Sequence, residues 1–394
     1  MKQVFNKTEN DIPSPSVKVG ILSFNKYSTL NYGAVLHPYA FQKYLDKNHI
    51  SNVIIDYMSR HFEYKMPNFP IIAATRNKKG WGYLKGLVGG ALRWPSACIR
   101  YRKIFEFCNK YNRNVNKNGR PFRQVDFENN DDIFIFNIIV CESDVIWSPL
   151  TNNGFERAFF ADFACFKDMR KVAYSPSISN TILTEKQEHE FKLLLNNFDF
   201  LSVREHETAE YVQKITGREC AHVLDPTLLL DEHDYDTITA KIKESKKYLL
   251  CYNCECNDLL MVDKAKELSR KMGLEFIEVS LNVRNKLSHK VLTSLGIEEF
   301  LGYIKNAEFI VTNGFHGMCF SIIFKKNFYV YLRSEFNLKF NLVYKLGLER
   351  YFVTSKDRHK YLEDIHIDYS SVYEKLNEFR KVSEEFINKA IVNH

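Results

Sequence analysis

Three observations predict an α/β protein built from two Rossmann-like domains. The chain has 394 residues, which is more than one ordinary domain requires. It opens with an apolar strand, a helix and a second apolar strand, and a new series of strands and helices begins after a charged stretch at residues 231–247. A hydrophobic content of 45% and an aromatic content of 14% exclude a disordered or fibrous chain. We expect an N-terminal domain over residues 17–230, a C-terminal domain over 247–370, and a last segment, 371–394, whose helix packs back on the first domain.

The first domain is expected to begin with a βαβ unit. Its strand, helix and strand are predicted at residues 17–24, 34–46 and 53–57. The turn after the first strand lacks the glycine fingerprint of dinucleotide-binding proteins, because only Gly20 and Gly33 lie near it. This argues against a nicotinamide or flavin enzyme. The sixteen residues before the strand are polar and lack the apolar core of a secretory signal.

The remaining elements of the first domain follow from apolar runs and helix end signals. Further strands are expected at residues 133–140, 171–175, 200–203 and 222–224. Thr184 and Gln187 form a capping box for a helix that ends near Leu195. Gly217 is the stop signal of a helix at residues 208–215.

The second domain repeats the alternation of strand and helix. Its strands are expected at residues 247–253, 274–279, 309–312 and 328–332. Its helices are expected at residues 258–272, 297–304, 318–324 and 337–346, before the long last helix at 372–391. Gly273 is the stop signal of the first of these helices.

The formal charge of +7 comes from one segment, the basic aromatic insertion at residues 64–105. No Asp or Glu lies between Tyr64 and Ile104, whereas nine cations do: Lys65, Arg76, Lys78, Lys79, Lys85, Arg93, Arg100, Arg102 and Lys103. Trp81, Tyr83, Leu84, Leu87, Val88, Leu92 and Trp94 accompany them. Basic and interfacial aromatic residues together favour the surface of an anionic membrane. A solvated loop-and-helix insertion explains the composition equally well, and no nucleic-acid-binding motif accompanies it.

The nine cysteines and the lack of a signal peptide favour a reducing cytoplasm. The cysteine cluster at Cys251–Cys256 has no second ligand pair at zinc-site spacing, so we expect no metal. The longest uncharged run of the insertion, between Lys85 and Arg93, is too short to span a bilayer. We therefore predict a cytoplasmic protein with peripheral contact at the inner face of the membrane.

A histidine lies in the predicted turn between the strand at 309–312 and the helix at 318–324. His316 is flanked there by Gly314, Phe315 and Gly317. Ligands of open α/β sheets bind at the carboxyl ends of strands, where backbone N–H groups and the positive end of a helix dipole are exposed. His316 is thus a candidate for holding an anionic substrate, although a histidine in a turn also serves as a capping or packing residue.

Three more candidates follow predicted strands at the same edge. Asp144 and Trp147 come after the strand at 133–140, and Arg204 comes after the strand at 200–203. A guanidinium can bind a carboxylate or phosphate through two hydrogen bonds. The alternatives are a turn or helix-capping role for Asp144 and a surface ion pair for Arg204.

Five segments together resemble the polysaccharide pyruvyl transferase family. In chain order they are LNYGAVLHPYAFQKYL, CESDVIWSP, SVREHETAEYV, VLDPTLLL, and TNGFHGMCFSIIF with the trailing KLGLERY. They cover most of the chain from Val17 to about Tyr351. The resemblance implies a fold similar to the GT-B glycosyltransferases, with two Rossmann-like domains that face a cleft.

The resemblance also implies an activity. Family members with an assigned activity transfer the enolpyruvyl unit of phosphoenolpyruvate to a hexose and close a cyclic pyruvate ketal on a bacterial glycan, such as an exopolysaccharide or capsule intermediate. The FHG histidine, here His316, is implied as the acid/base catalyst, and the arginine of the SVRE segment, here Arg204, as a ligand of the donor. The scheme demands no metal or nucleotide cofactor. The expected partners are phosphoenolpyruvate and a glycan acceptor that could be lipid-linked, and not nucleic acid.

The remaining candidate residues lie beside these two. We assign donor binding to Arg204, Asn313, Gly314, Phe315 and Gly317, and we take Asn31, Tyr32, Gly33, Asp144 and Trp147 as acceptor or cleft candidates.

The chain departs from the family pattern at two places. Glu142, Ser143, Asp144 and Val145 stand where the family usually has Gly-Ser-Asp-Gln, and Asn313-Gly314 replaces Asp-Ser. Losing a carboxylate beside His316 would lower the basicity of its imidazole. A GT-B-type glycosyltransferase that uses a sugar nucleotide and a non-catalytic protein of glycan assembly therefore stay open as alternatives. The sugar that is modified and the oligomeric state do not follow from the sequence.

Overall fold

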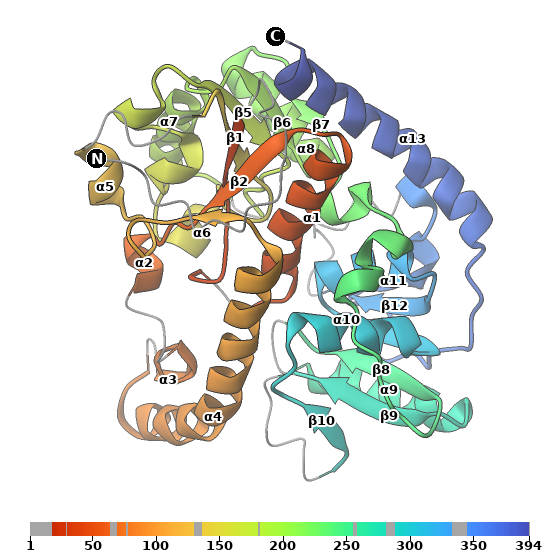
Figure 1. The fold of residues 1–394 in the computed structure, drawn as a ribbon. Coiled ribbons are helices and arrows are strands. Elements are labelled where there is room, and N and C mark those ends of the chain that lie inside the picture. Colours follow the sequence, from red (N-terminus) through yellow and green to blue (C-terminus); the bar gives the residue numbers. More distant parts are fainter. Residues whose placement is uncertain are drawn as a thin grey trace.

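The computed structural model describes residues 18–28, 30–63, 69–75, 78–129, 136–179, 182–254, 258–280, 288–332 and 345–393. Two lobes are visible in Figure 1, each with one sheet and its helices, and the long helix α13 (Tyr369–Ile387) runs along the outside of both. The expected leader lies outside the described residues, as do Cys256 and most of the helix predicted at 337–346.

The N-terminal lobe contains a seven-stranded sheet in the order β3-β2-β1-β4-β5-β6-β7, whose paired strands all run parallel. The strands are β1 Lys18–Leu22, β2 Ser51–Ile55, β3 Asn114–Val115, β4 Ile138–Glu142, β5 Arg170–Tyr174, β6 Phe200–Val203 and β7 Ala221–His222. Every residue of β4 is buried, as the continuous apolar run predicts for a central parallel strand. The strand order reverses between β1 and β4, because β2 and β3 lie on one side of β1 and β4 to β7 lie on the other. Ligands of open α/β sheets bind at such a point.

The C-terminal lobe contains a six-stranded parallel sheet in the order β10-β9-β8-β11-β12-β13. The strands are β8 Tyr248–Tyr252, β9 Glu275–Val279, β10 Lys290–Leu292, β11 Phe309–Thr312, β12 Asn327–Tyr331 and β13 Phe352–Val353. The two sheets confirm the predicted α/β class with two Rossmann-like domains.

The longer helices lie where the sequence predicts them, whereas four helices of four to seven residues were not predicted. Besides α13, the helices are α1 Gly33–Lys47, α2 Arg60–Glu63, α3 Phe69–Thr75, α4 Gly80–Tyr111, α5 Gln124–Glu128, α6 Pro149–Asn152, α7 Glu185–Leu195, α8 His206–Thr216, α9 Leu259–Lys271, α10 Ile297–Asn306 and α11 Phe315–Ile323. Short 3₁₀ turns include η3 Pro226–Leu229 and η4 Glu232–Ile238. The capping box at Thr184 is present, and Gly217 and Gly273 adopt the left-handed conformation that ends a helix.

Several predicted boundaries were wrong. The strand expected at residues 133–140 is β4, which begins at Ile138 and ends at Glu142. Helix α11 begins at Phe315 instead of Met318, because Gly314 already takes the extended N-cap conformation. His316 therefore lies in the first turn of the helix and not in a loop before it. Helix α4 begins within the insertion and continues to Tyr111, and its Phe107 and Cys108 pack in the core.

Contacts between the lobes centre on Tyr32, directly before α1. Its ring stacks on Phe300 of α10 with centroids 4.3 Å apart, and its hydroxyl donates to the Leu295 carbonyl at 3.2 Å. The guanidinium of Arg100 in α4 lies 3.8 Å from the centre of the Tyr32 ring. Burial raises the pKa of Tyr32 to about 12, so the phenol stays neutral. The aromatic stack thus holds the start of α1 against the second lobe, and the cation–π contact holds α4 against the same tyrosine.

Helix α13 contacts both lobes. Tyr373 donates to the Ile323 carbonyl at the end of α11, and Ser383 accepts from the Leu224 backbone N–H at 2.9 Å. Arg380 donates to the carbonyls of Leu228 and Leu230. The helix therefore holds the segment around η3, which lies next to the candidate site.

Candidate functional site

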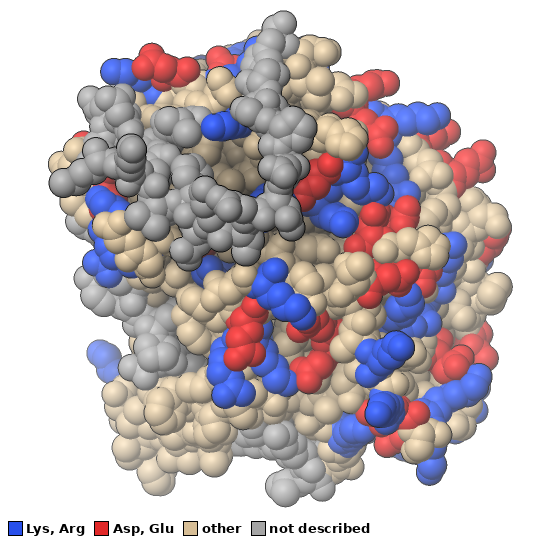
Figure 2. Space-filling view, in the orientation of Figure 1, with Lys and Arg blue, Asp and Glu red and all other residues tan. Residues whose placement is uncertain are grey.

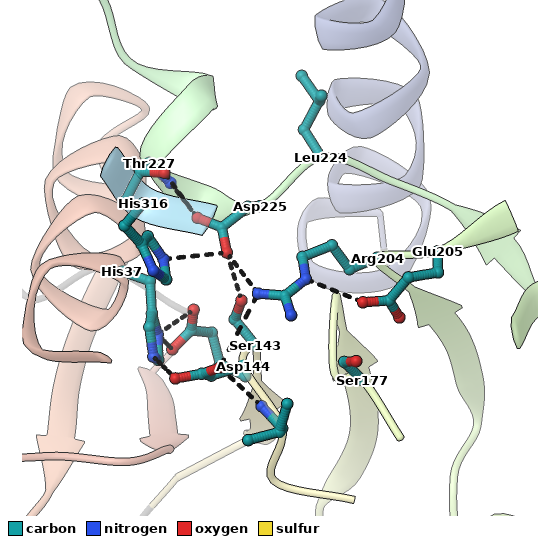
Figure 3. A network of polar contacts seen from close by, with 12 residues as sticks. His37, Ser143, Asp144, Ser177, Arg204, Glu205, Leu224, Asp225, Thr227 and His316 are labelled. Carbon is teal, nitrogen blue, oxygen red and sulfur yellow. Dashed lines mark hydrogen bonds and ion pairs between the residues drawn. The ribbon is translucent and has the colours of Figure 1, made fainter. Parts of the chain in front are cut away.

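Polar side chains from separate parts of the chain meet where the two lobes join (Figure 3). They come from α1, from the ends of β4 and β6, from the segment after β7 and from the first turn of α11. The residues are His37, Glu142, Ser143, Asp144, Arg204, Asp225, Thr227 and His316. Carboxyl strand ends of both sheets thus contribute to one cluster, as expected for a ligand site of an α/β protein.

The central pair of the cluster is His316 and Asp225. Nε2 of His316 lies 3.6 Å from Oδ2 of Asp225, and the His316 side chain is 6% exposed. Asp225 is fully buried and is fixed on its other oxygen, Oδ1, by the Thr227 backbone N–H at 3.0 Å and the Thr227 hydroxyl at 2.7 Å. The Ser143 hydroxyl and Arg204 donate to Oδ2 at 3.1 and 3.3 Å. Asp225 is therefore held rigidly with one oxygen toward the imidazole.

The surroundings of Asp225 keep it ionised. Burial raises its pKa, but His316 and Arg204 outweigh burial and hold the pKa well below the usual value of an aspartate. A fixed carboxylate beside an imidazole orients the ring and stabilises its protonated form. His316 and Asp225 thus have the arrangement of an acid/base dyad.

Gly33 allows His316 to approach the first lobe. A Cβ atom on Gly33 would lie 2.7 Å from Cβ of His316 and closer still to Cγ and Nδ1 of its ring. Real Cβ atoms do not come this near to another side chain, so the first residue of α1 must be a glycine for this packing. Asn31 supports the turn by accepting a hydrogen bond from the Gly33 N–H at 3.0 Å.

A second histidine lies beside the first. The rings of His37 and His316 are nearly parallel, with centroids 6.1 Å apart. Nδ1 of His37 lies 3.0 Å from both carboxylate oxygens of Glu142, and Nε2 lies 3.7 Å from Asp144. Burial lowers the pKa of His37, but Glu142 and Asp144 outweigh it and raise the pKa to about 10. Burial in turn raises the pKa of Glu142, so the buried pair of His37 and Glu142 retains a proton at neutral pH.

Arg204 is already paired with carboxylates. Its guanidinium lies 3.1 Å from Glu205, 3.3 Å from Asp225 and 4.0 Å from Asp144. It also lies 4.4 Å from the centre of the Phe315 ring. Burial raises the pKa of Asp144, but His37 and Arg204 keep it below its usual value. The surface ion pair weighed for Arg204 is thus a buried one, and its charge is balanced within the cluster.

The backbone at the ends of β4 and β5 is strained. Ser143 and Asp144 have φ angles of 48° and 52°, and Ser175 has 60°, all in the left-handed region. Such conformations cost about 1 kcal/mol or more for a residue with a side chain, and they concentrate at functional sites. Here they turn the Asp144 side chain toward His37 and the Ser143 side chain toward Asp225.

The family model for polysaccharide pyruvyl transferases matches residues 31–335, which is more than half of the chain and includes every residue of the cluster. The chain belongs to the polysaccharide pyruvyl transferase family. This confirms the resemblance found in the five sequence segments. No curated protein matches the chain at a significant level.

Solved structures with similar folds are distant. The UDP-bound MnaA structure of S. aureus has a TM-score of 0.47 and 11% identity, covering 94% of this chain and 90% of that one. The UDP-GlcNAc 2-epimerase of Methanocaldococcus jannaschii, in complex with UDP-GlcNAc and UDP, has a TM-score of 0.41 and 13% identity over 96% and 100%. The glycosyltransferase SnogD of Streptomyces nogalater has a TM-score of 0.38 and 8% identity over 94% and 96%. Similarity at this level carries no argument about the ligand of this chain.

Several of the predicted site residues lie in or beside the cluster. His316, Arg204 and Asp144 are members, Phe315 contacts the Arg204 guanidinium, and Gly33 contacts His316. Gly317 has a packing role, because an added Cβ would lie 2.7 Å from the Tyr252 ring.

Two of the acceptor or cleft candidates lie elsewhere. Trp147 is fully buried in the core of the first lobe, where it stacks on Phe160 and donates to the Phe159 carbonyl at 3.0 Å. It was wrongly taken as a cleft residue, because the chain turns it inward directly after the strand. Tyr32 has no open face for an acceptor either, since it is closed between the lobes by Phe300 and Arg100.

The substitution of Asn313-Gly314 for Asp-Ser does not remove the carboxylate next to His316. The Asn313 side chain points to the neighbouring loop, accepting from the Cys254 N–H at 2.8 Å and donating to Asn253 at 3.1 Å. A Cβ on Gly314 would lie 2.9 Å from Cys254, so Gly314 also serves this packing. The carboxylate beside His316 is that of Asp225, ninety-one residues earlier in the chain.

The sequence reasoning missed Asp225 and His37. Asp225 lies in the quoted segment VLDPTLLL, where an Asp-Pro-Thr sequence is also an ordinary helix cap, and Asp225 does cap η3. His37 lies within a helix that is buried on nearly all sides, so no polar face set it apart. Among the described residues, no group of three or more His, Cys, Asp or Glu is arranged to hold a metal ion.

Proposed function

We propose that this chain transfers the enolpyruvyl group of phosphoenolpyruvate to a hexose of a bacterial surface-polysaccharide intermediate. The product is a cyclic pyruvate ketal, and phosphate is released. The observation that carries the proposal is the buried, ionised Asp225 fixed beside His316, in a chain that the pyruvyl transferase family model matches across this site. An acid/base group that works near neutral pH is what the chemistry demands, and imidazole is the usual choice.

The first step is addition of a sugar hydroxyl to the enol carbon. His316 donates a proton to the methylene carbon of the donor, which becomes a methyl group, and then accepts the proton of the attacking sugar hydroxyl. The enol carbon passes through a cationic, oxocarbenium-like state while the sugar oxygen bonds to it. The carboxylates of Asp225 and Asp144 stabilise positive charge at this point and on the imidazolium.

The second step closes the ketal. A second hydroxyl of the same sugar attacks the same carbon, the bond from that carbon to the phosphate oxygen breaks, and the hydroxyl proton leaves with phosphate. One molecule of phosphate is formed for each ketal, and no redox partner or metal takes part. Asp225 keeps the His316 ring in one orientation during both steps, so we assign it a positioning role.

The anionic groups of the donor require positive charge. Arg204 supplies it, and since three carboxylates already surround its guanidinium, we infer that the donor displaces at least one of them. The proton held by His37 and Glu142 provides a second favourable contact next to His316. Donor binding is therefore coupled to a change in the ion pairs of the cluster.

Thermal unfolding with and without excess phosphoenolpyruvate tests the donor assignment. A ligand at ~100 times its dissociation constant stabilises the folded state by about 2.7 kcal/mol. Arg204→Ala would leave buried carboxylates without their partner at a cost of about 3–5 kcal/mol. The better variant is Arg204→Lys, which keeps the positive charge but cannot form bidentate hydrogen bonds with a carboxylate or phosphate.

We expect phosphoenolpyruvate to raise the melting temperature of the wild type and to raise that of Arg204→Lys much less. A shift with a nucleoside diphosphate in place of phosphoenolpyruvate would favour the sugar-nucleotide glycosyltransferase. Retained glycan assembly in cells that carry His316→Ala would favour the non-catalytic role.

A further inference from the structure

The N-terminal half of α4 carries large apolar side chains in water. Trp81 is 74% exposed, Leu84 50%, Val88 62% and Leu92 56%. At about 100° per residue these four positions fall within about 80° of the helix circumference, so they form one stripe. Ile99, beyond Pro95 in the same helix, is also exposed. We call this stripe the α4 apolar face.

The opposite side of the helix is the one that packs. Gly86 lies so close to the Ala74 carbonyl of α3 that no side chain fits between the helices. Gly90 and Ala97 are buried on the same side. Helix α4 thus packs on α3 through its opposite side. The α4 apolar face is therefore exposed although the helix already has a packing partner.

Basic side chains border the α4 apolar face, and the insertion itself contains no acidic residue. Lys78, Lys79 and Lys85 are exposed, and the sequence has no Asp or Glu from Tyr64 to Ile104. Elsewhere on the surface seen in Figure 2 the two charge signs alternate, whereas the region over α3 and α4 is mostly uncharged. Two of the three tryptophans of the chain, Trp81 and Trp94, are exposed on this helix. Tryptophan and lysine are the residues that favour the boundary between water and lipid.

Three of the basic residues of the insertion do not belong to this surface. Arg100 is buried against Tyr32, and Arg102 pairs with Glu106 at 3.5 Å. Lys103 reaches Glu299 of α10 at 2.7 Å. The C-terminal half of α4 is thus fixed to both lobes, and the N-terminal half projects from this anchor, as Figure 1 shows.

We propose that the N-terminal half of α4 binds the surface of an anionic lipid membrane. The α4 apolar face enters the headgroup region, and Lys78, Lys79 and Lys85 pair with lipid phosphates. A second copy of the chain is a poorer occupant, because a symmetric contact would bring the same lysines together. Among the described helices none is long and apolar enough to cross a bilayer, and the proposed contact is with one leaflet only. This inference does not depend on the proposed activity.

Cosedimentation of the full-length chain with vesicles tests the proposal. The probe is phosphatidylcholine vesicles with and without phosphatidylglycerol. We expect binding to the anionic vesicles and at least about tenfold weaker binding by Lys78→Gln/Lys79→Gln/Lys85→Gln. The matched control Lys186→Gln/Lys192→Gln/Lys214→Gln removes the same charge from exposed positions of α7 and α8 and should bind like the wild type.

Tryptophan fluorescence separates insertion from simple charge attraction. Lipids brominated on the acyl chains should quench the emission of Trp81, which lies on the α4 apolar face, while the buried Trp147 is shielded. Trp81→Phe should lose this quenching. The proposal would be overturned if the wild type and the α4 lysine variant sedimented equally, or if anionic vesicles caused no quenching. Binding to an acidic protein or to nucleic acid, without binding to vesicles, would also overturn it.

Discussion

Gly33→Ala tests the proposed site at the point where α1 meets His316. The added Cβ would overlap Cβ of His316 by about 0.7 Å relative to ordinary contact at ~3.4 Å, and it would overlap the ring more severely. Overpacking of this kind costs about 1–3 kcal/mol. The higher helix propensity of alanine relative to glycine stabilises the folded chain by at most about 1 kcal/mol. We therefore expect a net loss of up to about 2 kcal/mol and a displaced imidazole, and a misplacement of ~1 Å lowers turnover about 100-fold.

Gly89→Ala in α4 is the matched control. No atom lies within 4 Å of a Cβ built on Gly89, so the same change should raise stability by up to about 1 kcal/mol and leave turnover unchanged. Urea denaturation and phosphate release from phosphoenolpyruvate in the presence of a glycan acceptor are the two assays. If Gly33→Ala were as stable and active as Gly89→Ala, the close packing of His316 on α1 would be refuted.

Three further predictions concern the residues around this contact. Asp225→Asn should lower turnover at least about 1,000-fold with little change in KM, because it removes the charge that positions His316; a loss confined to KM would contradict this role. Trp147→Phe should lower the free energy of unfolding in urea by about 1–3 kcal/mol and leave KM unchanged, since Trp147 is a core residue. An altered KM for the acceptor would instead indicate that Trp147 contributes to the acceptor site. The pKa of His37 is raised from about 6.5 to about 10, so its stabilising contribution is full below about pH 6.5 and is lost as the pH rises through 10. The unfolding free energy should therefore fall over that range, and an equal fall in His37→Gln would show that another group causes it.

The elements of the site could be predicted because their signals are local. Strands β4 and β11 lie between other strands of parallel sheets, so they appear as continuous apolar runs. The residues that follow such strands must meet at one edge of the sheet, which is why Asp144, Arg204 and His316 could be selected. The family resemblance added the role of His316.

The partners of these residues could not be predicted, because they depend on tertiary packing. Asp225 faces His316 only because η3, α1 and α11 come together, and its local sequence describes an ordinary cap. His37 meets Glu142 across 105 residues of the chain. Arg204 was expected to bind the donor or to form a surface ion pair, yet its guanidinium is buried and also faces Asp225 and Asp144, which no local pattern indicates.

The most direct test of the central claim is to measure the ketal product. The purified chain is incubated with phosphoenolpyruvate and with glycan intermediates, and the acceptor is analysed by mass spectrometry while phosphate is quantified. The proposed function predicts that the acceptor gains the mass of pyruvate less one water, with one phosphate released per ketal, and that folded His316→Ala is at least about 100-fold slower. Ketal formation at the wild-type rate by His316→Ala would contradict the central role of His316. Transfer of a sugar from a nucleotide donor, with no ketal formed, would contradict the proposed reaction.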